Sequence, residues 1–227
     1  MPAARTSRPL DHVVAVSGSV LVVASLVIIW AARSTVHRPA YVSELGVLGE
    51  PTAQWFEMAL LLLAGGGSAI AWAARDIRST APMIGRWSPA VSLWVGCAFF
   101  VLASQVPCSL GCPLPYGSTF TGPDLVHTLA AVVAFAAACT AMLQAAFTTG
   151  YGVLARVSLG AAVLVAVIAG AGGLLSVLRF GTDFGTVFEL VATTIAIGWL
   201  VAFGGVVAWS RRPPARRPEL SGATALL

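Results

Sequence analysis

Six long apolar runs follow one another along the chain, separated by short polar segments. They cover about residues 12–32, 53–74, 87–107, 124–148, 154–178 and 185–209. Each run has the roughly 20 residues that an α-helix needs to cross a bilayer core of about 30 Å. The runs lack the apolar–polar alternation of barrel strands. The pattern therefore predicts an all-α integral membrane protein, a bundle of six transmembrane helices.

The connections between the runs are too short for a soluble domain, so residues 12–209 are predicted to form one transmembrane domain. Residues 1–11 would be a cytoplasmic N-terminal segment, and residues 210–227, which are polar and proline-rich, a disordered cytoplasmic tail. Because the first run exceeds the 7–15 apolar residues of a signal peptide, we expect it to be retained as a helix. The composition agrees, since 58% of the 227 residues are hydrophobic and 10% are charged.

The basic residues, all of them arginine, predict the orientation. With six spans, all but Arg33, Arg38 and Arg179 fall on the side that carries both termini. Since short cytoplasmic loops are enriched in basic residues, both termini are predicted to be cytoplasmic in a multi-pass protein of the cell membrane. The arginines lie at the helix ends and form no separate basic patch, which argues against nucleic-acid binding.

Two of the four cysteines lie in the second outward loop, in the sequence PCSLGCP. Cys108 and Cys112 could form a disulfide outside the cytoplasm, or contribute half of a metal site. The disulfide is favoured because His127 is the only histidine near that loop and no second cysteine pair accompanies it. The sequence therefore predicts no metal site and no cofactor. Cys97 and Cys139 lie inside apolar runs and are predicted to be structural.

Acidic and polar side chains gather at the outer ends of the second, fourth and sixth runs. Glu57 and Glu189 lie about one turn inside their helices, a depth at which ionisable groups usually face a cavity. Asp124 and His127 have i,i+3 spacing and share a helix face. We therefore expect an outward-facing pocket within the membrane domain. The candidate catalytic residues are Glu57, Asp124, His127 and Glu189, and the candidate substrate-binding residues are Tyr41, Ser43, Glu44, Gln54, Trp55 and Gln105.

Each candidate catalytic residue also has a structural alternative. Asp124 can cap the helix that begins beside it, and Glu189 forms with Thr186 the Thr-x-x-Glu pattern of a capping box. Glu57 can pair with an arginine of the first outward loop. His127 can be a hydrogen-bonded histidine of the interior. These alternatives stay open at the level of the sequence.

Some of these residues also carry a family likeness. The motif YVSELG at 41–46, the polar start of the second run, Asp124-Leu-Val-His127 and Phe188-Glu189 together resemble the DUF998 family. More distantly, Tyr-x-Ser-Glu before a membrane helix is similar to the Frag1/DRAM/Sfk1 proteins. The resemblance covers most of residues 12–209 and implies a six-helix membrane protein of unknown function. It rests on Tyr41, Ser43, Glu44, Gly46, His127 and Glu189.

Three functions fit these features. The first is an enzyme that performs acid/base chemistry on a lipid or isoprenoid-like substrate, by cyclisation, isomerisation or hydrolysis. A carboxylic acid held away from water keeps its proton more readily and can act as a general acid, with His127 or a second carboxylate as base. The second is a non-catalytic lipid-binding or assembly subunit of the cell envelope, with a membrane-protein partner. The third, a small transporter, is less favoured because the inner halves of the helices have few polar residues.

Overall fold

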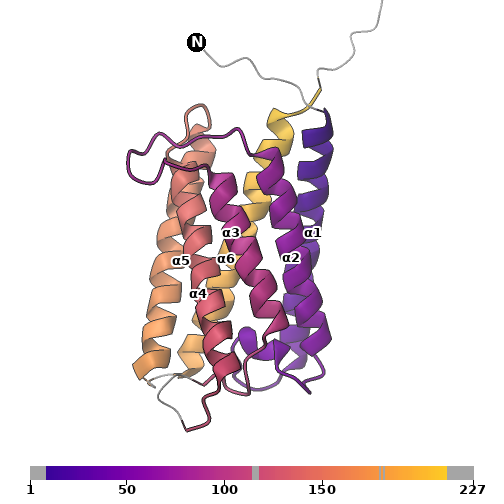
Figure 1. The fold of residues 1–227 in the computed structure, drawn as a ribbon, viewed down its shortest axis with the longest axis vertical. Coiled ribbons are helices and arrows are strands. Elements are labelled where there is room, and N and C mark those ends of the chain that lie inside the picture. Colours follow the sequence, from indigo (N-terminus) through magenta and orange to yellow (C-terminus); the bar gives the residue numbers. More distant parts are fainter. Residues whose placement is uncertain (1–8, 114–117, 179, 181, 214–227) are drawn as a thin grey trace, which may run out of the picture.

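The computed structural model describes residues 9–113, 118–178, 180 and 182–213. This part of the chain is helical and contains no strand, which confirms the predicted fold class (Figure 1). The predicted tail beyond residue 213 and the first eight residues lie outside the described residues. The elements are α1 (Pro9–Thr35), the 3₁₀-helix η1 (Ser43–Gly46), α2 (Ala53–Ala73), α3 (Pro89–Gln105), α4 (Gly122–Ala146), α5 (Gly152–Leu178) and α6 (Thr182–Ser210).

Five of the six α-helices are long and apolar enough to cross a membrane, and α3 is shorter. Its 17 residues extend over about 26 Å at 1.5 Å per residue. Ser88 has an extended backbone (φ −77°, ψ 158°), so the helix begins only at Pro89. It ends at Gln105 because Pro107 disfavours a helical conformation of the residue before it. The predicted run at 87–107 is therefore trimmed at both ends by proline.

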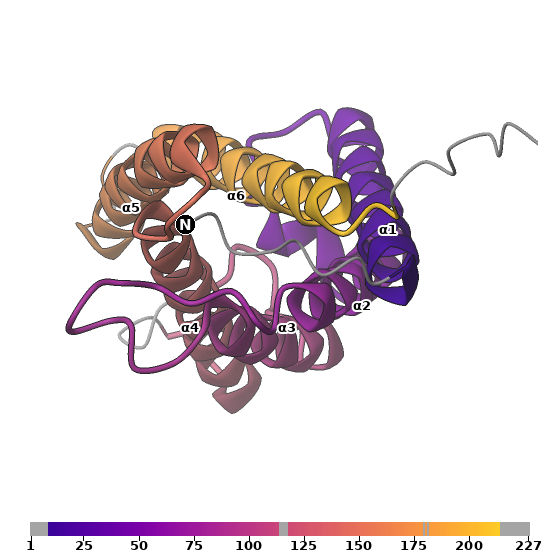
Figure 2. The ribbon, with the colours of Figure 1, turned by 90° about the horizontal axis from the view of Figure 1, so that it is seen from above.

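The six α-helices form a closed ring in chain order. Each helix packs against the next one along the chain, and α6 returns to pack against α1 (Figure 2). The chain enters α1 and leaves α6 at the same end of the bundle, which we call the terminal end (Figure 1). At the opposite end, which we call the loop end, lie the connections that follow α1, α3 and α5. The even number of spans predicted from the sequence thus brings the two termini together.

Glycines allow the closest contact between helices, where α1 meets α2. A Cβ atom added at Gly18 would lie 2.7 Å from the carbonyl oxygen of Gly66, and one added at Gly66 would lie 2.6 Å from that of Gly18. Both distances are below van der Waals contact, so only glycine fits either position. Helices in a membrane associate by such close packing, because lipid is as apolar as the helix surface.

Polar contacts tie the helices together at the terminal end. The buried Asp11 carboxylate on α1 forms an ion pair of 3.0 Å with Arg75, which follows α2. Nδ1 of His12 lies 2.8 Å from the carbonyl oxygen of Ala208 on α6. These contacts link α1 to both of its neighbours.

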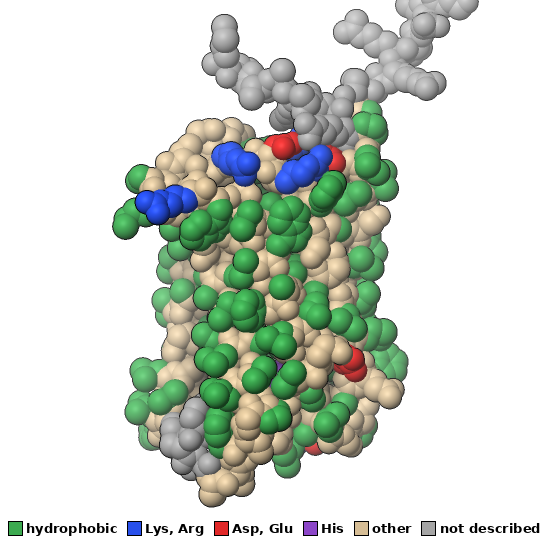
Figure 3. Space-filling view, in the orientation of Figure 1, with side chains coloured by type: hydrophobic (Ala, Val, Ile, Leu, Met, Phe, Trp, Pro, Cys, Tyr) green, Lys and Arg blue, Asp and Glu red, His purple; other side chains and the backbone are tan. Residues whose placement is uncertain are grey.

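The outer surface of the bundle is that of a protein embedded in lipid. Apolar side chains cover the middle of the face seen in Figure 3, and the arginines visible there gather at the terminal end. At this end Trp72 and Trp209 are exposed, and the guanidinium groups of Arg75 and Arg212 lie 4.9 and 4.2 Å from their respective ring centroids. Exposed tryptophans beside arginines are typical of the membrane–water interface. The chain is a polytopic membrane protein.

The orientation of the bundle stays a prediction and can be tested with two engineered cysteines. Leu48 at the loop end is 81% exposed, and Met83 at the terminal end is 85% exposed. If the arginine-rich terminal end is cytoplasmic, a membrane-impermeant maleimide should label Leu48→Cys in intact cells and Met83→Cys only after lysis. The inverse pattern would place the termini outside.

Candidate functional site

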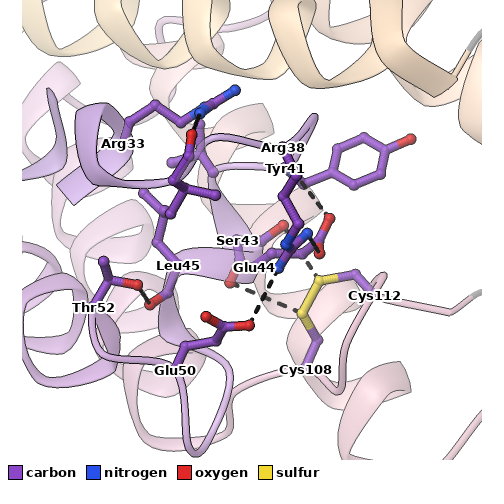
Figure 4. Close-up of polar contacts among 12 residues, drawn as sticks. Arg33, Arg38, Tyr41, Ser43, Glu44, Leu45, Glu50, Thr52, Cys108 and Cys112 are labelled. Atoms are coloured by element: carbon purple, nitrogen blue, oxygen red, sulfur yellow. Dashed lines mark hydrogen bonds and ion pairs between the residues drawn. A yellow bond between two sulfur atoms is a disulfide. The ribbon is translucent and has the colours of Figure 1, made fainter.

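The first connecting loop, residues 36–52, is held in shape by Glu44 (Figure 4). This buried carboxylate accepts a hydrogen bond of 3.0 Å from the backbone N–H of Tyr41 and one of 2.6 Å from Arg38. Arg38 also pairs with Glu50 at 3.3 Å. The hydrogen bond to Glu44 is the main cause that raises the pKa of Arg38 above its usual value. Glu44 therefore stabilises the loop from within.

Glu189 connects this loop to α6. Its carboxylate accepts hydrogen bonds from the backbone N–H groups of Val42, at 2.8 Å, and Ser43, at 3.3 Å. The hydroxyl groups of Tyr41 and Ser176 lie 2.8 Å apart and tie the same loop to α5. The loop is thereby folded over the ends of two helices rather than extended away from them.

The capping-box alternative for Glu189 is wrong, because α6 begins earlier than the hydropathy suggests. The helix starts at Thr182, so Glu189 lies about two turns inside it. The Thr186 hydroxyl donates to the carbonyl oxygen of Asp183 at 2.7 Å, whereas a capping hydroxyl accepts a hydrogen bond from a backbone N–H. Glu189 is thus free to bind the connecting loop.

The loop between α3 and α4 contains a disulfide between Cys108 and Cys112, as predicted, with the two Cα atoms 5.2 Å apart. Both sulfur atoms pack against η1 (Figure 4). Oγ of Ser43 lies 3.4 Å from Sγ of Cys112, and the carbonyl oxygen of Ser43 lies 3.9 Å from Sγ of Cys108. Ser43 therefore contacts α6 through its N–H and the disulfide through its oxygen atoms.

Asp124 at the start of α4 holds the other side of this disulfide loop. Its Oδ1 accepts hydrogen bonds from the backbone N–H and the hydroxyl of Ser109, at 2.7 and 2.8 Å. Its Oδ2 accepts from the N–H and hydroxyl of Thr121, at 2.8 and 2.6 Å, in a reciprocal capping box. These four bonds occupy the acceptor sites of the carboxylate. The structure uses Asp124 as a helix cap, which is the structural alternative that the sequence left open.

His127, one turn further along α4, is buried with 5% of its surface exposed. Its Nδ1 lies 3.1 Å from the carbonyl oxygen of Ala103 and 2.9 Å from that of Val106, at the end of α3. Carbonyl oxygens only accept hydrogen bonds, so Nδ1 must be the protonated nitrogen, and in the neutral ring Nε2 is an acceptor. The histidine satisfies carbonyls that the end of α3 leaves unpaired and retains a second functional nitrogen.

A cavity of about 80 Å³ lies inside the ring of helices. The polar residues Ser43, His127 and Glu189 line it toward the loop end. On α6 its lining extends from Glu189 to Leu200, or about 16 Å along the helix. The wall is mainly apolar, and its large side chains include Phe56, Leu60, Leu63, Phe100, Phe135 and Trp199. The cavity therefore has the form expected for an amphiphile: a narrow apolar space with one polar end.

The remaining candidates on α2 and α3 lie outside this cavity. Gln54, Trp55 and Glu57 are exposed on the surface of α2, and Glu57 accepts a hydrogen bond of 3.2 Å from the exposed Gln105. Phe56, the residue before Glu57, points into the cavity, and successive residues are about 100° apart around a helix. The predicted convergence of Glu57 with His127 and Glu189 is therefore wrong. Among the described residues, the hydrogen-bond partner of Glu57 is the amide of Gln105 rather than an arginine of the first connecting loop.

Comparison with known protein families identifies one match. The model of the family described as "Protein of unknown function (DUF998)" matches residues 16–206. The chain belongs to the DUF998 family. This is a membrane protein family of unknown function, in agreement with the bundle described above. No curated protein and no solved structure matches the chain. The more distant likeness to the Frag1/DRAM/Sfk1 proteins stays a prediction.

Several residues that line the cavity of this DUF998 protein were not anticipated from the sequence. Cys97 and Thr193 belong to the wall, as does Trp199, whose Nε1 donates to the Ser158 hydroxyl at 2.8 Å. A helical spacing from Glu189 would have identified part of this set, because residues 189, 193, 196, 197 and 200 share one face of α6. Within the described residues, no cluster of three or more histidine, cysteine or acidic side chains could hold a metal ion.

We expect Asp124→Ala to destabilise the protein by about 2 kcal/mol, since it removes a helix cap and releases the disulfide loop. Asp183→Ala is the matched control: Asp183 is also in the first turn of its helix, but it is exposed. Its loss should cost only about 0.3–1 kcal/mol of dipole interaction. Unfolding in detergent measures both effects, and equal losses would contradict the role given to Asp124.

Proposed function

We propose that this DUF998 protein binds an amphiphilic molecule inside its helix bundle. The apolar chain of the ligand would lie along the cavity, and its polar head would meet Ser43, His127 and Glu189. The observation that carries this proposal is the cavity itself, with an apolar wall and polar groups at one end. Ligand sites in proteins commonly combine such a wall with a few placed polar groups.

The membrane location determines where the selectivity of such a site arises. Moving an apolar chain from lipid into an apolar cavity gains little hydrophobic free energy, since lipid tails are as apolar as the wall. The shape of the cavity and the hydrogen bonds at its polar end must therefore distinguish the ligand from bulk lipid. With the terminal end in the cytoplasm, this polar end would face the outer leaflet.

A second candidate function is acid/base catalysis on the bound lipophilic molecule. It is favoured by the pair His127 and Glu189, which border the same cavity. A neutral His127 can take up a proton at Nε2, and Glu189 can accept or donate one, as isomerisation, cyclisation or hydrolysis would require. Glu57 and Asp124 have no part in this scheme, because one is exposed and the other caps α4.

Glu189→Gln separates binding from catalysis. Glutamine preserves the size of the side chain and an oxygen acceptor but cannot transfer a proton. If Glu189 is a catalytic acid or base, the variant should retain bound lipid and lose its conversion by about 10²-fold or more. Mass spectrometry of lipids incubated with the purified protein measures both quantities. Full conversion by a folded Glu189→Gln protein would exclude this residue as the catalytic group.

Filling the cavity tests the binding proposal directly. Ala131 on α4 lines the cavity, whereas Ala136 on the same helix is exposed on the outer surface. Ala131→Leu should lower the amount of co-purifying lipid about tenfold, because overpacking a filled site costs about 1–3 kcal/mol. Ala136→Leu should leave it unchanged. Solvent extraction of both purified variants, followed by mass spectrometry, gives the comparison, and equal lipid contents would contradict the proposal.

A further inference from the structure

We infer that the head group recognised at the polar end of the cavity is a hydrogen-bond donor: the hydroxyl of a long-chain alcohol or the ammonium of a long-chain amine. This inference rests on the proposed function, since it concerns the same cavity. It excludes ethers and esters, whose head groups only accept hydrogen bonds, and it disfavours phosphates. Three features of the polar end support it.

The first feature is the orientation of His127. The carbonyl oxygens of Ala103 and Val106 require a proton on Nδ1, as shown above. The neutral ring therefore offers an acceptor at Nε2. His127 lines the cavity and is buried, with 5% of its surface exposed, so a ligand in the cavity would lie beside its ring.

The second feature is the remaining acceptor capacity of Glu189. Each oxygen of a carboxylate can accept more than one hydrogen bond. The backbone N–H groups of Val42 and Ser43 occupy one site on each oxygen, so acceptor sites remain next to the cavity. The same two bonds fix the position of the carboxylate. A donor on the ligand would meet an acceptor that is already oriented, which lowers the entropic cost of binding.

The third feature is the charge of the polar end. Among the described residues that line the cavity, none is an arginine. Arg38 of the neighbouring loop is engaged by Glu44 and Glu50. A phosphate head would therefore enter a desolvated site without a described cation to neutralise its charge, and burial of an unpaired charge is costly. An ether or ester would leave the acceptors of His127 and Glu189 unpaired.

Cys97 provides a direct measure of occupancy. This free cysteine is part of the cavity wall, whereas the free Cys139 of α4 is not among the described lining residues. A bound chain should slow the alkylation of Cys97 by N-ethylmaleimide and leave the rate at Cys139 unchanged. Cys108 and Cys112 are blocked by their disulfide. Mass spectrometry of the peptides reports both rates in one sample, so Cys139 corrects for effects of the amphiphile on the micelle.

The experiment uses the delipidated full-length protein in detergent and four probes that share one chain short enough for the cavity: decanol, decylamine, decyl methyl ether and decyl phosphate. Decanol or decylamine should protect Cys97 at a concentration at least tenfold lower than the ether or the phosphate. The relative potency of the alcohol and the amine shows which donor the site prefers. In the Glu189→Gln protein, the difference in protective concentration between the donor probes and the acceptor probes should become smaller. The reason is that a glutamine amide can also donate a hydrogen bond to a head group that only accepts.

The outcomes separate the inference from the proposal on which it rests. If the ether or the phosphate protects Cys97 as well as the alcohol and the amine do, the inference of a hydrogen-bond-donating head group is refuted. The proposal that an amphiphile binds in the cavity then still stands. If none of the four probes protects Cys97 selectively over Cys139, binding of a single-chain amphiphile in this cavity is refuted. The unaltered protein alone decides both questions, so the result does not depend on the folding of the variant.

Discussion

The loop end of the bundle depends on one interaction, the binding of two backbone N–H groups by the carboxylate of Glu189. Val42 and Ser43 donate these bonds from a loop that would otherwise leave the helices. Backbone groups near a membrane need partners, because little water is available to satisfy them. Glu189 supplies such partners from within α6 and so draws the loop over the end of the bundle. The carboxylate that fixes the loop also borders the cavity.

Further polar contacts extend from this interaction across the loop end. Ser43 packs against the disulfide, the loop of the disulfide is bound by Asp124, and Asp124 caps α4. One turn later on α4, His127 binds the last carbonyl groups of α3. Side chains thus satisfy some of the unpaired backbone groups at the end of α3 and at the start of α4. The loop end is thus a connected polar layer above an apolar bundle, and it leaves the cavity below it with a defined polar border.

This arrangement separates residues with similar chemistry into different roles. Asp124 and Glu44 have their carboxylates engaged by neighbouring loop groups and stabilise the fold. Glu57, on the surface, accepts a hydrogen bond from the amide of Gln105. Glu189 and His127 combine a structural bond with a position on the cavity wall. In a lipid environment, where burial of an apolar chain gives little selectivity, two oriented acceptors at the end of a narrow space can decide which amphiphile is bound.

The sequence by itself determined the class of the protein. Hydropathy predicts six helices because a bilayer demands a minimum apolar length. Counting residues from a helix end correctly places Glu57 about one turn inside α2, but it places Glu189 too close to the end of α6, which begins earlier than the apolar run. The presence of Cys108 and Cys112 in one short loop, without a second cysteine pair, was sufficient to predict their disulfide. Only the tertiary structure decided which way each side chain faces. Soluble helices reveal their buried face by a polar opposite face, but a membrane helix is apolar toward lipid and toward its neighbours alike. For this reason the sequence did not show that Phe56, and not Glu57, lines the cavity. It also did not show that Asp124 caps a helix whereas Glu189 belongs to the cavity wall. The positions of the neighbouring helices decide both points.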